Sequence, residues 1–90
     1  MSSPHDAIWQ FPCSFPIKVL GENSPDLVNE VCAVVAVNAS NFNPDQDITI
    51  KHSSKGNYLA VTATITAESK TQLDSIYLAL NKHPLVKITL

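Results

Sequence analysis

The sequence predicts an α+β fold, a ferredoxin-like β-α-β-β-α-β sandwich in which two helices cover one face of a four-stranded antiparallel sheet. Three observations support this prediction. Residues 59–67 alternate apolar and polar side chains, two other segments combine a cap with helical periodicity, and 90 residues suit one small core. Residues 11–90 are expected to form that single domain, and residues 1–10 an N-terminal tail.

The chain begins without periodicity and then enters its first strand. Ile8, Trp9 and Phe11 are too apolar for a free tail, so we expect them to pack against the domain. The first strand is predicted over residues 15–20 and ended by Gly21. Its inward-facing side chains are those at alternate positions: Phe15, Ile17 and Val19.

A helix start follows the first strand. Ser24 can cap, Pro25 suits the first helical position, and Asp26 complements the positive end of the helix dipole. The apolar stripe consists of Leu27, Val31, Val34 and Val35. The second half of the helix has little polar surface. Either the N-terminal segment or a partner chain is expected to cover its remaining apolar residues: Ala33, Ala36 and Val37.

A polar loop with Phe42 as its expected anchor leads to a β-hairpin. The hairpin has a strand at residues 48–52, a turn at 53–57 and the alternating strand at 59–67. One face of the alternating strand is apolar and points inward: Leu59, Val61, Ala63 and Ile65. The polar opposite face is typical of an antiparallel sheet that helices cover on one side only.

The second helix is predicted after a capping box formed by Ser69 and Gln72, in which each side chain accepts a hydrogen bond from the main-chain N–H of the other residue. Its apolar stripe consists of Leu73, Ile76, Tyr77 and Leu80, and Pro84 follows its end. The last strand is predicted over residues 86–90. Alternation there places three apolar side chains inward: Val86, Ile88 and Leu90.

Right-handed crossovers around the central hairpin place the first and third strands in the middle of the sheet and the other two at its edges. Lys51 and Lys87 then lie on edge strands, where charge discourages pairing with another sheet. The open face is expected to carry Lys18, Lys51, Lys87, Thr49, Thr62, Thr64 and Thr89, with Leu20 and Ala60. Two interpretations of this face stay open: an anion-facing platform or an ordinary solvated surface.

Composition excludes several classes of function. A net charge of −2 argues against nucleic-acid binding, and the six basic residues are all lysines, so no guanidinium can clamp a phosphate. No apolar stretch approaches the ~18 residues of a membrane span. Cys13 and Cys32 match no metal spacing and suggest free thiols in the cytoplasm.

The turn of the hairpin is the candidate binding site. Its hydroxyls, lysine and glycine could form an anion nest, although a simple hairpin loop explains the same residues. The candidate ligand-binding residues are Lys18, Lys51, Ser53, Ser54, Lys55, Gly56, Asn57 and Tyr58. The loop at residues 21–26 is a second possible anion site, but its carboxylates make simple helix capping the plainer interpretation.

The sequence shows no catalytic constellation. His5, His52 and His83 are scattered, and no carboxylate or thiol stands at a diagnostic spacing from them. We therefore expect no catalytic residue, no metal and no cofactor. An enzyme that uses His52 or Cys32 is the remaining alternative.

The segment Lys51-His52-Ser53-Ser54-Lys55-Gly56-Asn57-Tyr58 resembles the YbeD-like family of small uncharacterised bacterial proteins. The similarity extends from about Ile8 to Leu90. It includes Phe11-Pro12, Phe15-Pro16, Lys18-Val19, Asp26-Leu27-Val28, Val31, Val34-Val35, Val61-Thr62, Thr64-Ile65 and the ending from Val86 to Leu90. It implies a ferredoxin-like fold similar to ACT regulatory domains. Those domains bind amino acids at a Pro-Gly-x-Leu loop, where this chain has Asp26 in place of the glycine.

These observations lead to two hypotheses. The first is an ACT-like regulatory or protein-interaction module without catalytic activity, which acts through a protein partner, a second copy of itself or a small effector. The second is a small-ligand or anion-binding protein that uses the Ser53–Tyr58 turn and the lysine-bearing sheet face.

Overall fold

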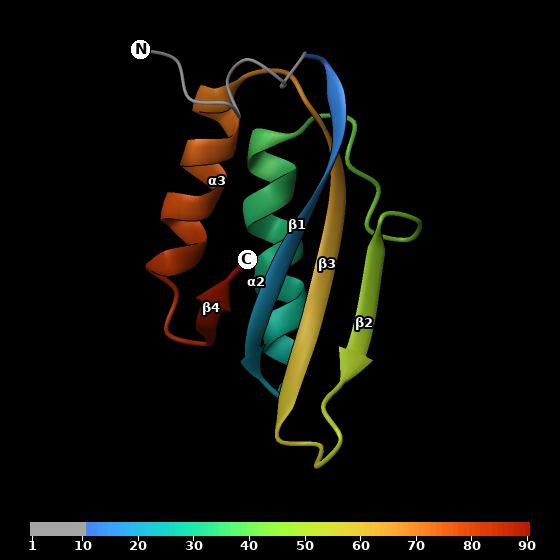
Figure 1. Cartoon of the computed structure of the whole chain (residues 1–90), viewed down its shortest axis with the longest axis vertical. Coiled ribbons are helices and arrows are strands. Elements are labelled where there is room, and N and C mark those ends of the chain that lie inside the picture. Colours follow the sequence, from blue (N-terminus) through green and yellow to red (C-terminus); the bar gives the residue numbers. More distant parts are fainter. Residues whose placement is uncertain (1–10) are drawn as a thin grey trace.

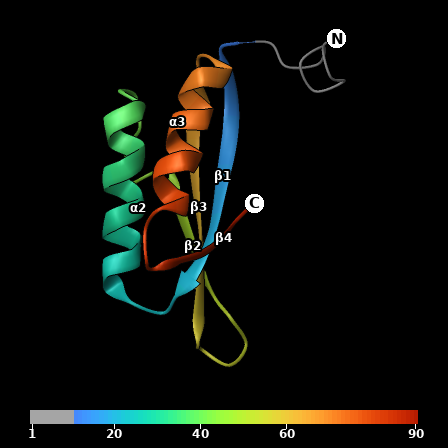
Figure 2. The same cartoon turned by 90° about the vertical axis from the view of Figure 1, so that its left-hand side faces the viewer.

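The computed structural model describes residues 11–90, so the expected tail, with Ile8 and Trp9, lies outside the described residues. The elements are β1 (Cys13–Glu22), α2 (Pro25–Asn38), β2 (Ile48–His52), β3 (Tyr58–Ala67), α3 (Lys70–Asn81) and β4 (Val86–Thr89). The strands form one antiparallel sheet in the order β2-β3-β1-β4. Both helices lie on one side of it (Figures 1 and 2). The predicted fold class, with central first and third strands, is confirmed.

The central strands β1 and β3 pair along their full length, from Cys13 opposite Ala67 to Glu22 opposite Tyr58. Their inward side chains form the middle of the core, and Ile17, Val61 and Ala63 have no exposed surface. β1 is longer than predicted at both ends: it begins at Cys13, and Gly21 continues the strand instead of ending it. A Cβ at Gly21 would lie 2.5 Å from the Leu85 carbonyl oxygen, so only glycine permits this close approach.

Helix α2 begins as the sequence predicts. The Ser24 hydroxyl accepts a hydrogen bond from the Asp26 N–H at 3.2 Å, with Pro25 in the first turn. The side chains that face the sheet are buried: Leu27, Val31 and Val35. On the outer side Val37 is 85% exposed, together with Ala33 and Ala36, so this apolar surface is uncovered among the described residues.

Helix α3 has the predicted cap in a modified form. The Ser69 hydroxyl accepts from the Gln72 N–H at 3.1 Å, as expected. The Gln72 side chain, however, accepts from the Glu68 N–H and also donates to the Asn38 carbonyl at the end of α2. The predicted apolar stripe is confirmed, with Tyr77 half-buried and three side chains fully in the core: Leu73, Ile76 and Leu80.

β2 is a regular edge strand. It pairs with β3 from Ile48 opposite Ala63 to His52 opposite Leu59 without interruption. The Thr64 N–H donates to the Asp47 carbonyl. Main-chain groups alternate in direction along a strand, so those of Thr49 and Lys51, two and four residues after Asp47, also face β3. The main-chain groups of Ile48, Ile50 and His52 therefore point away from the sheet.

β4 is a short, bulged edge strand, and here one prediction is wrong. Leu20 lies opposite Ile88, but Gly21 lies opposite Val86, so Lys87 is an extra residue in the strand. Val86, opposite Gly21, packs against the core as predicted, but after the bulge the expected faces are reversed, and the predicted inward faces of Ile88 and Leu90 are wrong. Thr89 lies opposite the buried Val19 and donates to Asn81 on α3, whereas Ile88 shares the open face with Leu20. Thr89 is therefore not on the open face.

Candidate functional site

The Ser53–Tyr58 turn is a closed hairpin loop. Gly56 takes the positive φ of 73° that such a turn requires, and its N–H donates to the Ser53 carbonyl at 2.9 Å. The Ser53 N–H donates to the Tyr58 carbonyl, and the Ser53 hydroxyl accepts from the Tyr58 N–H at 3.1 Å. Ser53 thus closes the hairpin with both its main chain and its side chain.

The turn also contacts the loop between β1 and α2, although the two are more than 30 residues apart in the sequence. The Asn23 side-chain amide donates to the Gly56 carbonyl at 2.6 Å, and the Asn23 N–H donates to the Asn57 carbonyl at 3.2 Å. The two loops proposed as separate candidates therefore form one structural unit. Sequence reasoning missed the role of Asn23, because nothing local to an asparagine in a loop indicates a partner that distant.

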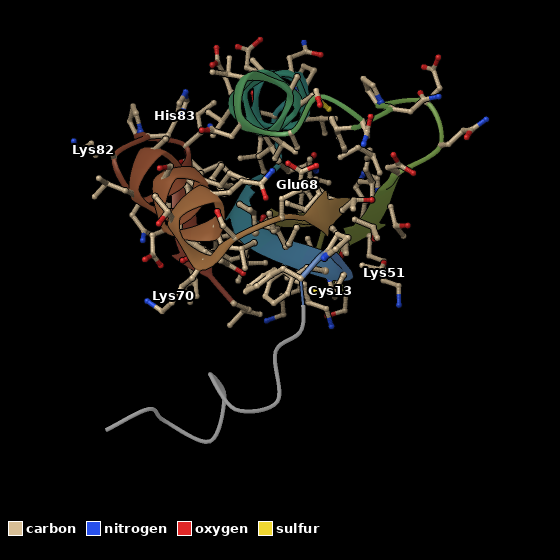
Figure 3. All side chains as sticks on the ribbon, turned by 90° about the horizontal axis from the view of Figure 1, so that it is seen from above. Cys13, Lys51, Glu68, Lys70, Lys82 and His83 are labelled. Atoms are coloured by element: carbon tan, nitrogen blue, oxygen red, sulfur yellow. The ribbon has the colours of Figure 1, made fainter. Side chains whose placement is uncertain are left out.

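The two candidate lysines lie on the open sheet face, apart from the turn. Lys18 is opposite Thr62 and Lys51 is opposite Ala60. Two strand spacings and two residues along the strands separate their Cα atoms, on the order of 12 Å. Figure 3, seen along the strands, shows Lys51 projecting on the side away from the helices. Lys18 and Lys51 thus share a face, and neither is part of the turn itself.

The remaining turn residues are exposed. Ser54, Lys55 and Asn57 project into solvent, and Tyr58 is 44% exposed opposite Glu22 on the open face. The Glu22 carboxylate and the Lys55 ammonium group thus both lie at this end of the sheet. No pocket is found within residues 11–90, so any ligand here would bind a surface and not a cavity.

Two titratable groups among the described residues have shifted pKa values. Burial raises the pKa of the Cys32 thiol and, independently, the pKa of the Tyr77 hydroxyl. A raised pKa keeps Cys32 as the thiol, which is the unreactive form. No cluster of three or more His, Cys, Asp or Glu side chains with metal-binding geometry occurs in the described part of the chain.

The His83 ring is held by contacts at both of its nitrogens. Its Nδ1 accepts a hydrogen bond from the Leu85 N–H at 3.2 Å, and its Nε2 lies 3.4 Å from a carboxylate oxygen of Glu30. Both ring nitrogens are therefore engaged, and the ring joins the α3–β4 connection to helix α2. His52 is exposed at the end of β2 and His5 lies outside the described residues.

Exposed apolar side chains mark both edges of the sheet. Ile50 on β2 is 42% exposed on the helix side, and Ile88 on β4 is 50% exposed on the open face. Leu90 follows β4, and its N–H donates to the Lys18 carbonyl, so it extends the exposed side of β4. Among residues 11–90 no helix is long and apolar enough to cross a membrane.

Comparison with known proteins places the chain in one family. A family described as "Protein of unknown function (DUF493)" matches residues 6–90. The chain is 41% identical to a UPF0250 protein of Chromobacterium violaceum, with both chains fully covered. It is 40% identical to a UPF0250 protein of Paraburkholderia phytofirmans, also over both full lengths, and 39% identical to one of Nitrosomonas europaea, over 94% of this chain and 97% of that protein.

These matches span nearly the whole domain and confirm the family that the Ser-Ser-Lys-Gly-Asn-Tyr segment indicated. The chain belongs to the DUF493 (UPF0250) family of small bacterial proteins of unknown function.

Proposed function

We propose that the chain is an ACT-like regulatory or interaction module, without catalytic activity of its own, that acts through a protein partner at the β2 edge. The observation that carries this proposal is the free side of β2. The main-chain groups of Ile48, Ile50 and His52 point outward in an unbroken row, beside an apolar side chain that stays partly exposed. An added strand would satisfy these groups and cover Ile50.

Two further features support a role in binding rather than in chemistry. The described residues form surfaces without a pocket, and the Cys32 pKa is raised toward the unreactive thiol. Both cysteines are free, which suits the reducing cytosol, so a cytoplasmic location is part of the proposal.

The test uses a proline that removes one outward N–H. Ile50→Pro takes a donor from the free side of β2 but leaves the hydrogen bonds to β3 intact, because proline is tolerated on strand edges. Tagged wild type and Ile50→Pro are compared in light scattering and in capture from Chromobacterium violaceum lysate. The control is Leu78→Thr, which changes an exposed apolar side chain on α3, away from both edges of the sheet.

We expect self-association or a captured protein that is retained by wild type and Leu78→Thr and lost in Ile50→Pro. The proposal is wrong if wild type is a strict monomer and captures nothing that Ile50→Pro does not capture.

A small anionic effector is the second candidate function. It is favoured by the bonds from Asn23, which bring the β1–α2 loop and the Ser53–Tyr58 turn together at the end of the molecule where Lys55 lies. Titration with inorganic phosphate and with free amino acids, followed by amide chemical shifts, is expected to move the signals of residues 53–58. An absence of shifts in this turn at millimolar ligand removes this candidate.

A further inference from the structure

The open face of the sheet carries two rows of side chains, and the bulge in β4 places an apolar side chain at one end of each row. One row crosses the sheet as Ile88, Leu20, Ala60 and Lys51. The next row runs as Leu90, Lys18, Thr62 and Thr49. Both rows begin with an exposed apolar side chain at β4 and include a lysine farther into the sheet.

The apolar part of this surface is not covered by either helix, since both lie on the other side of the sheet (Figure 2). Ile88 is 50% exposed and Leu90 is 71% exposed. Leu20 lies on β1, the strand between β3 and β4, and is only half-buried. Apolar side chains gathered in this way on one open face mark an interaction site more often than scattered ones do.

The charge on the two rows has one sign. Their charged side chains are Lys18 and Lys51. Two acids on this face, Glu22 opposite Tyr58 and Asp47 beside Thr64, belong to separate rows. Most other carboxylates lie on the helices and loops, for example Asp26 and Glu30 in α2, which contains no lysine. A partner with both apolar and acidic groups therefore complements the rows.

The dimensions of the surface suit a helix. Four strands spaced about 4.8 Å apart present a width of about 14 Å, which is the length of roughly ten helical residues. A helix laid across the strands can place leucines over Ile88 and Leu20 and carboxylates toward Lys51.

We propose that the open sheet face binds an acidic amphipathic helix of a partner protein, with the apolar stripe of that helix over Ile88, Leu20 and Leu90 and its carboxylates near Lys18 and Lys51. This surface is separate from the β2 edge, where a strand is proposed to bind, and the two proposals can fail independently.

The test uses designed peptides as probes and the full chain as receptor. One peptide of about 18 residues has leucines at i, i+3, i+4 and i+7 and glutamates on its polar face; the matched peptide has lysines in place of the glutamates. Binding is followed by amide chemical shifts of the protein and by fluorescence anisotropy at low and moderate salt.

We expect the acidic peptide to shift the amides of Leu20, Ala60 and Ile88, to bind better than the basic peptide, and to weaken as salt rises. Ile88→Thr is expected to weaken binding about tenfold. Lys51→Glu is expected to weaken binding of the acidic peptide and to strengthen binding of the basic one. Val37→Thr, on the far side of the molecule, leaves both unchanged.

Three outcomes overturn the proposal. The first is equal binding of both peptides or no shifts at millimolar peptide. The second is a set of shifts centred on Ile50, which assigns the binding to the β2 edge. The third is concentration-dependent shifts on both the open face and α2 without any peptide, which shows that a second copy of the chain covers the face.

Discussion

The two edges of the sheet differ in how they are held. β2 pairs with β3 without interruption over Ile48–His52, and its alternation continues that of its neighbour. β4 pairs with β1 over fewer residues, contains a bulge, and is supported from outside the ladder by Tyr77, Asn81 and Leu85. The regular edge leaves its main-chain groups free for another strand. The bulged edge instead turns apolar side chains toward solvent, so the two edges offer different kinds of surface.

The largest effect is expected at the support of β4. Gly21→Ala places a Cβ against the Leu85 carbonyl and the Leu27 side chain, at distances that real Cβ atoms do not adopt. Because the Leu85 carbonyl accepts the Glu22 N–H, the loop cannot move away without loss of that bond. We expect the free energy of unfolding to fall by about 1–3 kcal/mol, measured by the midpoint of urea unfolding. An unchanged midpoint would show that the β4 connection is soft.

The equivalent glycine on the β2 side is expected to matter less. Gly56 has open space around its Cα, and only its φ of 73° opposes a side chain. Gly56→Ala should therefore cost about 1 kcal/mol, and Gly56→Asn less, because asparagine tolerates this conformation. The same urea experiment measures both. A loss as large as that of Gly21→Ala contradicts the difference drawn between the two edges.

Tyr77 provides a pH-dependent test of the β4 edge. Tyr77→Phe removes the hydrogen bond from the hydroxyl to the Leu90 carbonyl and should cost about 0.5–1 kcal/mol near neutral pH. Burial raises the pKa of Tyr77, so the folded chain keeps the phenol proton after the unfolded chain has lost it.

Wild type therefore loses stability as pH rises from about 10, the usual pKa of tyrosine, through the raised pKa of Tyr77. The phenylalanine variant lacks this component, so the difference between the two proteins should narrow above pH 10. Urea unfolding at several pH values measures it, and a constant difference across that range contradicts the role of burial.

The smallest effects are expected for the exposed apolar side chains themselves. Ile50→Thr and Ile88→Thr each change a side chain that is about half exposed in its own edge strand. Threonine retains the β-branched shape that strands prefer, so each variant should unfold within about 0.5 kcal/mol of wild type. Thermal unfolding followed by circular dichroism checks this. A larger loss at either position indicates that the side chain contributes to the core and not to a binding surface.

The sequence predicted the elements and the core well, since these depend on local signals. Ser24 and Ser69 cap the helices as expected, and the alternation in β3 gave the correct buried face. The predicted faces of Ile88, Thr89 and Leu90 were wrong, because alternation assumes a regular ladder, whereas the bulge depends on how the chain past Leu85 meets Gly21.

The candidate site was predicted only in outline. The turn and its glycine follow from residue types, but the bonds from Asn23 to the turn join segments that no short-range pattern connects. For the same reason the exposed Ile88 could not be anticipated, since its orientation is decided by pairing with a strand that lies far away in the sequence.

The Gln72 side chain has a consequence for how the protein opens. Its amide oxygen accepts from the Glu68 N–H before α3, and its amide nitrogen donates to the Asn38 carbonyl, the last residue of α2. The start of one helix and the end of the other therefore share a single residue. Because local unfolding proceeds in cooperative units, we expect the end of α2 and the start of α3 to fray together, with Gln72 as the link between them.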